Sequence, residues 1–205
     1  MIKNYIKTLI RFRRNSKGAA AVEMALIAPV IISLILGSTE LALYLVAHQK
    51  ISRAASTISN LMTQMDEGIS ESQISDLMLA FDEVSKPLDF STNGKAIVSA
   101  IIGIGVDGAA PDSYTVAWQR CYGNSATSLT SIFGVEGDDV TTSNLPAQTI
   151  TTTSQIMVST EVSYVYTPLL NFLPLSDTIS YQAYFRPRLG SIETIIQDIT
   201  PIYGC

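Results

Sequence analysis

A single carboxylate interrupts an otherwise apolar stretch near the N-terminus. The stretch reads KGAAAVEMALIAPVIISLILG over residues 17–37, and Glu23 is the only ionisable residue between positions 19 and 39. At a bilayer centre a carboxylate costs about 2.5–3.5 kcal/mol. If the chain is cut after Gly18, the new N-terminal amine belongs to Ala19, and Glu23 becomes the fifth residue. An ammonium and a carboxylate in contact offset each other's burial cost. The pair therefore predicts a charge contact, within one chain or between neighbouring chains, that sets the register of stacked helices.

The other reactive residue types do not form a recognisable catalytic set. The string GIGVDG (103–108) fits a phosphate-binding glycine pattern, but a proline and a strand-like segment follow it where a helix is needed. His48 is the only histidine, and no serine stands in a nucleophile-elbow pattern. The acidic run EGDD (136–139) lacks EF-hand spacing, and it and the adjacent Asp82 and Glu83 are expected to be solvated. We therefore predict no catalytic residue, no metal ligand and no cofactor, and a protein that is not an enzyme.

Charge is distributed unevenly along the chain. All six charged residues in positions 1–18 are basic, so the remaining chain holds 7 basic (13 − 6) and 18 acidic residues, a net charge of −11. A basic arm followed directly by an apolar run is typical of a membrane-targeting segment whose cations stay in the cytoplasm. The acidic remainder argues against a body that binds nucleic acid.

The apolar run has the length of a membrane span. Residues 19–39 would form a helix about 30 Å long, which matches a hydrocarbon core. A cleaved secretory signal, a plain signal anchor and a prepilin-type leader are the competing interpretations. The run is long for a secretory signal, which has an apolar region of about 7–15 residues. We expect one crossing, with residues 1–18 as a cytoplasmic leader and the C-terminal body outside.

Two cysteines, Cys121 and Cys205, are the only ones in the chain. On the outer side of a membrane an isolated pair most simply forms a disulfide, whereas in a reducing compartment both would be free thiols. We favour the bridge, which would close a loop of about 85 residues and contribute about 4–5 kcal/mol in the chain-entropy model.

Hydrophobic periodicity extends the first helix well beyond the span. Apolar residues continue at steps of three and four to about residue 65, so the half at 40–65 is amphipathic. Proline removes a helical hydrogen bond and glycine weakens the helix, so Pro29 and Gly37 are the expected bends. A capping box at Ser70 and Gln73 predicts a second helix that ends before Pro87.

The period then changes to that of strands. Segments 95–106 and 114–123 predict a hairpin, and segments 155–170 and 177–189 predict two further antiparallel strands. A polar loop occupies 124–154, and the tail after residue 190 has room for one short helix. The predicted fold is α+β: a long N-terminal helix packed on a small antiparallel sheet, with residues 66–205 as the head.

The N-terminal segment RRNSKGAAAVEMALIAPVIISLILGSTELA resembles the class III signal of type IV pilins and, more closely, TadE-like minor pseudopilins of the tight adherence (Tad, Flp-type) pilus. The later stretches VSYVYTPLL and FRPR resemble that family's late strand and its end. The resemblance is strong over 11–45, weaker over 162–188 and absent between them. One departure is Met24, because an aromatic residue often follows the glutamate in the family.

The resemblance implies a pilin-like fold and cleavage between Gly18 and Ala19 by a prepilin peptidase. The implied partners are that peptidase, the major and minor pilins, the inner-membrane assembly platform and the lipid bilayer. The protein would cross the inner membrane once, with a periplasmic head, and assist the initiation of an adhesive pilus or act at its tip or base. The longer TadG-like type shares the N-terminal motif, but 205 residues leave little room for its extra domain. The alternative is a signal-anchored periplasmic binding domain that never joins a fibre.

Overall fold

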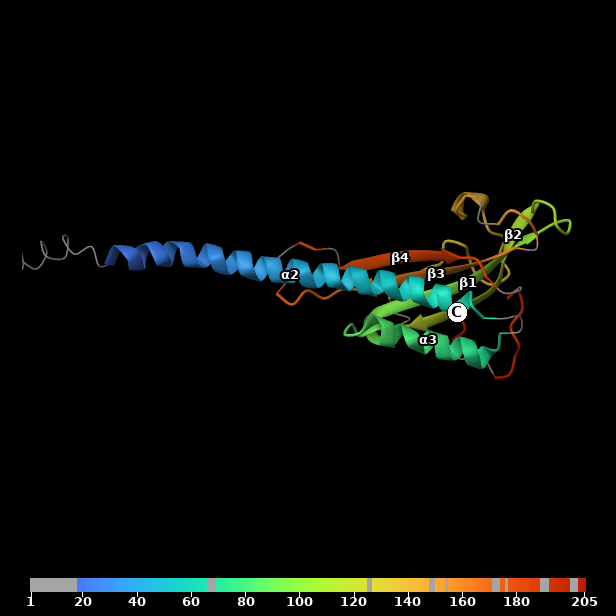
Figure 1. Ribbon diagram of the computed structural model, residues 1–205, viewed down its shortest axis with the longest axis horizontal. Helices are drawn as coiled ribbons and strands as arrows, with labels where there is room; N and C mark the ends of the chain where they lie inside the picture. The colour runs from blue at the N-terminus through green and yellow to red at the C-terminus, as the bar shows by residue number, and fades with distance from the viewer. Residues whose placement is uncertain are drawn as a thin grey trace, which may run out of the picture. The chain divides into compact units, whose positions relative to one another are not determined.

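The computed structural model describes residues 18–65, 69–124, 127–147, 150–153, 155–170, 174–175, 177–188, 192–199 and 203–205. Of the predicted leader (1–18), residues 1–17 lie outside the described residues. The elements in chain order are α2 (Ala19–Met62), α3 (Glu71–Ser85), α4 (Phe90–Asn93), β1 (Gly94–Ile104), β2 (Ser113–Gly123), η2 (Thr142–Asn144), β3 (Ile156–Val165) and β4 (Thr178–Phe185) (Figure 1). The predicted α+β fold, with its long N-terminal helix and small antiparallel sheet, is confirmed.

The chain divides into two compact units, which are described separately. Unit 1 comprises residues 1–43 and 168–174, and unit 2 comprises residues 44–167 and 175–205. Among the described residues, α2 is the one helix long and apolar enough to cross a membrane. This agrees with a single membrane anchor near the N-terminus.

In unit 1 the apolar part of α2 presents its side chains outward. Val22, Leu26 and Leu34 are 61%, 72% and 67% exposed. Two hydroxyls near the end of the span bond within the helix: Ser38 Oγ and Thr39 Oγ1 each donate to the carbonyl of Ile35. Such back-bonding lets serine and threonine sit in an apolar segment. The surface is therefore suited to lipid.

In unit 2 four strands form one antiparallel sheet in the order β2-β1-β3-β4. The two predicted pairs, β1 with β2 and β3 with β4, are confirmed. The central pair is β1 with β3, in a register that sets Ile97 opposite Glu161. A register shift between Ala100 and Ile101 interrupts the pairing of β1 with β2.

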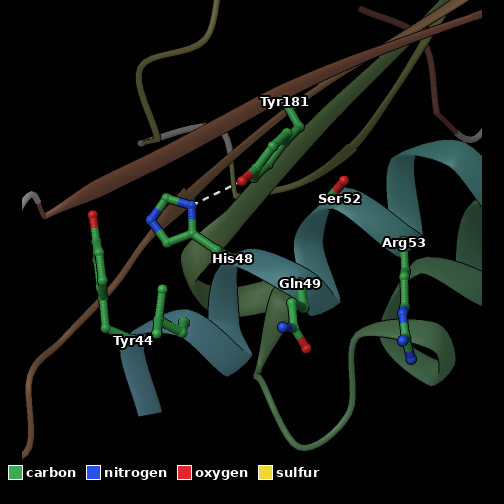
Figure 2. A pocket seen from close by; sticks show the side chains of 7 residues that line it. Tyr44, His48, Gln49, Ser52, Arg53 and Tyr181 are labelled. Carbon is green, nitrogen blue, oxygen red and sulfur yellow. Dashed lines mark hydrogen bonds between the residues drawn. The ribbon is translucent and has the colours of Figure 1, made fainter. Parts of the chain in front are cut away.

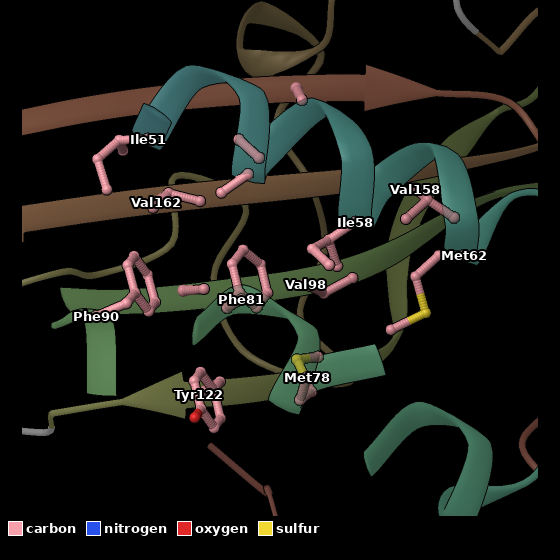
Figure 3. Close-up of a cluster of buried hydrophobic side chains, with 14 of the residues drawn as sticks. Ile51, Ile58, Met62, Met78, Phe81, Phe90, Val98, Tyr122, Val158 and Val162 are labelled. Carbon is pink, nitrogen blue, oxygen red and sulfur yellow. The ribbon is translucent and has the colours of Figure 1, made fainter. Parts of the chain in front are cut away.

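One face of the sheet packs on helices. Side chains from the second half of α2 and from α3 meet alternate residues of the strands and form the main core (Figure 3). Fully or almost fully buried members are Ile51, Ile58, Met62, Ile74, Met78, Phe81, Val98, Val158 and Val162. Since alternate strand residues share a face, burial at 98, 158 and 162 places this core on the helical side.

The opposite face of the sheet carries a smaller core. Ile101, Val116 and Met157 point to this side and pack with Phe133 and Val140 from the polar loop after β2. The loop forms the short 3-10 helix η2 and a single bridge from Asp139 to Thr115. The loop that sequence analysis placed at 124–154 therefore covers the second face of the sheet.

Helix α3 begins as the sequence predicts. The Ser70 hydroxyl accepts from Gln73 N, and the Gln73 side chain accepts from Ser70 N, which completes the capping box. The expected short helix in the tail is wrong over the described residues 192–199, which instead form a bridge between Ile196 and Ser70.

Candidate functional site

The N-terminus of α2 carries the predicted cleavage and pairing residues. Helix α2 starts at Ala19, directly after Gly18, and Glu23 lies one turn further on. Among the described residues other than its chain neighbour and its own helix, none lies within 4 Å of the place that a side chain would occupy at Gly18. Positions 19 and 23 are separated by four residues and so share a helix face. An amine created at Ala19 would therefore lie about 6 Å along the axis from Glu23, at 1.5 Å per residue.

Glu23 is an exposed charge on an apolar surface. Its neighbours Val22 and Met24 are 61% and 64% exposed, and the described part of the chain offers the carboxylate no hydrogen-bond or ion-pair partner. A carboxylate at this position is costly in lipid unless a cation meets it. The cleavage at Gly18–Ala19 and the pairing role of Glu23 stay predictions.

Pro29 and Gly37 lie within a continuous helix, since α2 runs without interruption through both positions. The bends expected there stay predictions. Together with Ser33, Leu34 and Leu41 these residues line a shallow groove along α2. Small residues on one helix face let a second helix approach closely in a membrane.

Glu40 differs from Glu23 because it is buried. Glu40 is only 1% exposed, and its Oε1 accepts a hydrogen bond of 3.1 Å from the backbone N–H of Leu170. Both residues belong to unit 1. The first charged residue after the apolar run is therefore used to hold a distant part of the chain.

The only histidine lines an open groove between α2 and β4 in unit 2 (Figure 2). His48 Nδ1 lies 3.0 Å from the Tyr181 hydroxyl, and its ring makes an edge-to-face contact with Tyr44 at 4.4 Å between centroids. Gln49 and Arg53 project on the other side of the groove (Figure 2). This arrangement packs the imidazole between the rings of Tyr44 and Tyr181.

A buried ion pair ties α3 to the sheet. Arg120 of β2 binds Glu71, the first residue of α3, through Nη2 and through Nε, whose distances to the two carboxylate oxygens are 3.0 and 3.2 Å. The two side chains are 7% and 1% exposed. Burial alone would lower the pKa of Arg120, but the hydrogen bond and the charge of Glu71 outweigh it and raise the pKa. The pair is structural, and the linear sequence does not reveal it.

Two acidic clusters that were expected to be solvated are engaged. Glu136 Oε2 accepts from Arg120 Nη1 at 3.1 Å and from the backbone N–H of Gln119 at 3.2 Å. Asp82 Oδ2 accepts from the Tyr122 hydroxyl at 2.6 Å. Each carboxylate finds a donor on β2, which the linear sequence does not reveal. The Glu136 side chain is nevertheless 54% exposed, so the expected solvation holds for it, whereas Asp82 is partly buried.

Cys121 and Cys205 are joined by a disulfide with a sequence separation of 84 residues. Beside it, Cys121 N donates to Tyr203 O at 2.7 Å, and Gly204 forms an antiparallel bridge with Arg120. The bridge thus fastens the C-terminal residues along the outer edge of β2. Covering an edge in this way removes backbone groups that would otherwise pair with another chain.

Glu161 is buried on the loop-covered face of β3. It is 1% exposed, and it accepts hydrogen bonds from Ser131 Oγ at 2.5 Å and from Ile132 N at 3.1 Å. Burial raises its pKa above the ordinary value, although the two hydrogen bonds act in the opposite direction. Through Ser131 and Ile132 the carboxylate anchors the loop to the sheet.

Comparison with known proteins adds one finding. Residues 18–59 match the family model described as TadE-like protein. No curated protein and no solved structure matches the chain. The match starts at Gly18 and includes Glu23 and Glu40, so it covers the segment that carries the candidate site. The TadE-like family comprises structural and assembly proteins of the Tad pilus and is not known for enzymes. The resemblance is therefore confirmed for this segment: residues 18–59 are similar to the TadE-like family.

Proposed function

We propose that the protein is a minor pseudopilin that assists the assembly of a Tad-type adhesive pilus, at its initiation or at its tip or base. A prepilin peptidase cuts between Gly18 and Ala19. The observation that carries the proposal is the TadE-like match, which begins at Gly18 and includes Glu23 on an exposed apolar helix. The work of the protein is interaction, and no enzymatic activity is proposed.

The charge of Glu23 supports a role in subunit register. In the uncut chain the carboxylate faces lipid without a cation among the described residues. Cleavage creates an ammonium at Ala19, and either the same chain or an adjacent pilin can present it to Glu23. A charge pair of this kind supplies specificity, because helices in any other register leave both charges unpaired. Glu23 thus selects the axial position at which neighbouring helices pack.

The remaining parts of the proposal concern topology and partners. The protein crosses the inner membrane once, with the leader in the cytoplasm and unit 2 in the periplasm, and it reaches the cell surface if it enters the pilus. The disulfide between Cys121 and Cys205 suits an oxidising compartment. Its partners are the peptidase, the major and minor pilins, the assembly platform and the bilayer. The proposed division is a leader (1–18), a spanning half-helix (19–39), an amphipathic half-helix (40–65) and a head (66–205).

The pairing role is tested with Glu23→Gln, which keeps the size of the side chain and removes its charge. Leu26→Ala is the matched control, since Leu26 lies on the same apolar stretch and is 72% exposed. We expect both variants to reach the membrane fraction in normal amount. Piliation, counted by electron microscopy, should fall strongly in Glu23→Gln and stay near normal in Leu26→Ala.

Normal piliation in Glu23→Gln would remove the glutamate from the mechanism. Normal piliation after deletion of the whole chain would instead favour a signal-anchored periplasmic binding domain that is not a fibre component. The two results are distinct, because the first retains a requirement for the protein.

A further inference from the structure

A short turn of unit 1 contacts α2, although the two segments lie far apart in the sequence. Pro168, Leu169 and Leu170, here called the leucine turn, belong to the same compact unit as residues 1–43. The backbone N–H of Leu170 donates to Glu40 Oε1 at 3.1 Å, across a separation of 130 residues. The acceptor Glu40 is 1% exposed, so this partly buried hydrogen bond fixes the turn against α2.

The leucine turn directs its apolar side chains outward. Leu169 is 75% exposed and Leu170 is 46% exposed. No charged residue occurs between Glu161 and Asp177, so the turn lies in the middle of an uncharged stretch of the sequence. A single exposed leucine needs no explanation, but two adjacent ones continue the exposed apolar surface of the span.

The position of Glu40 sets the depth of the turn. A hydrocarbon core about 30 Å thick takes about twenty helical residues, and the apolar run of α2 ends at Thr39. A turn held at residue 40 therefore lies where the hydrocarbon meets the headgroups. Apolar side chains at this level are favourably buried among the upper acyl chains.

We propose that the leucine turn is a second membrane-contacting element, which inserts Leu169 and Leu170 into the outer interface of the bilayer while Glu40 clamps it to α2. The partner is the uncharged part of a phospholipid layer, since the turn offers no cation for an anionic headgroup. The inference rests on α2 being the membrane anchor. It goes beyond the proposed pilus role because it concerns the protein before it joins any fibre.

The test uses the full chain in phosphatidylcholine vesicles at a low protein-to-lipid ratio. The native cysteines are bonded to each other, so a single added thiol can carry a nitroxide spin label. The labelled variants are Leu169→Cys, Leu79→Cys and Leu34→Cys. Leu79 is a matched control, being a leucine of α3 that is 51% exposed, and Leu34 reports the span itself. Collision with oxygen and with a water-soluble nickel complex measures depth.

We expect the ratio of oxygen to nickel accessibility at 169 to exceed that at 79 several-fold and to lie below that at 34. Adding Glu40→Ala should move the value at 169 toward that at 79, whereas Glu40→Gln, whose amide oxygen still accepts a hydrogen bond, should preserve it. Equal ratios at 169 and 79, with lipid exposure retained at 34, would overturn the turn's role and leave the anchor intact.

Two other results would also contradict the proposal. Low accessibility of the label at 169 to both reagents, with broadening from a second label, would mean that another copy of the chain covers the leucines. Water exposure at 34 would remove the membrane anchor, and with it both the proposed topology and the inserted turn.

Discussion

Removing the carboxylate of Glu71 should lower the free energy of unfolding more than removing any exposed charged side chain of unit 2. The pair with Arg120 is buried on both sides, with side chains 1% and 7% exposed. Deleting one partner of a buried pair leaves the other as an unpaired buried charge, which costs about 3–5 kcal/mol. Arg120 would keep a second carboxylate, Glu136, but the Glu136 side chain is 54% exposed and lies 3.1 Å from Nη1 alone. We therefore expect Glu71→Ala to lose about 3 kcal/mol, the lower end of the range.

The assay is denaturation of the full chain in detergent, followed by the fluorescence of Trp118. That residue is the only tryptophan, it is 2% exposed, and its Nε1 donates to Ile192 O at 2.7 Å, so its emission reports unfolding of unit 2. Glu83→Ala is the control. Glu83 pairs with Lys86, but their side chains are 73% and 66% exposed, and such pairs contribute about 0–1 kcal/mol.

A double replacement, Glu71→Leu with Arg120→Met, tests whether the loss of stability comes from the unpaired charge of Arg120. Exchanging a whole buried pair for apolar residues is often close to neutral, so the double variant should recover most of the loss. The account is refuted if Glu71→Ala and Glu83→Ala lose the same free energy. It is also refuted if the double variant is as unstable as Glu71→Ala, because the cost would then not come from an unpaired charge.

Three further predictions concern unit 2. The pKa of Glu161 is higher in the folded than in the unfolded chain, so the free energy of unfolding should fall as pH rises from about 4.5 through the folded pKa. In a series of denaturation curves at different pH, Glu161→Gln should lack that fall. A pH profile of the variant equal to that of the native chain would contradict the prediction. Cys205→Ser should lower the stability by about 4–5 kcal/mol and speed amide exchange at position 121, whose N–H bonds Tyr203 O; protection equal to the native chain would refute this. Gly123→Ala should destabilise more than Gly137→Ala, because both have positive φ but only the side chain at 123 would collide with Gly94 O; equal losses in thermal unfolding would show that φ alone decides.

Local signals explain why so much of the fold could be predicted. The capping box of Ser70 and Gln73 and the proline at 87 bound α3 on both sides, and these interactions span only a few residues. The change from helical to alternating period located all four strands, since burial of one sheet face imposes a two-residue repeat. The hairpin of β1 and β2 follows from a short polar turn between them.

Long-range contacts could not be predicted in the same way. The pairing of β1 with β3 joins segments separated by more than 50 residues in the register of Ile97 with Glu161, and neither strand alone specifies a partner. Arg120 did carry a signal, because it shares a strand face with the apolar Trp118 and Tyr122. A charged residue in an apolar register indicates a buried partner, but nothing in the sequence identifies that partner as Glu71. Glu161 carries no such signal, because its nearest neighbours on the same face of β3 are Ser159 and Ser163.

The residues of the candidate site show the same contrast between local signals and long-range contacts. The cleavage at Gly18–Ala19 and the pairing role of Glu23 stay predictions, which rest on spacing along one helix. The bond from Leu170 to Glu40 could not be foreseen, since it joins positions 130 residues apart. That contact places the apolar turn beside α2.

The mass of the membrane form tests the central claim most directly. We predict that the protein from cells with an active prepilin peptidase lacks residues 1–18 and begins at Ala19, and that the protein from cells without the peptidase keeps its full length. A full-length chain in both strains would contradict the account. So would a cut beyond residue 37, because it would remove Glu23 together with the amine it is proposed to meet.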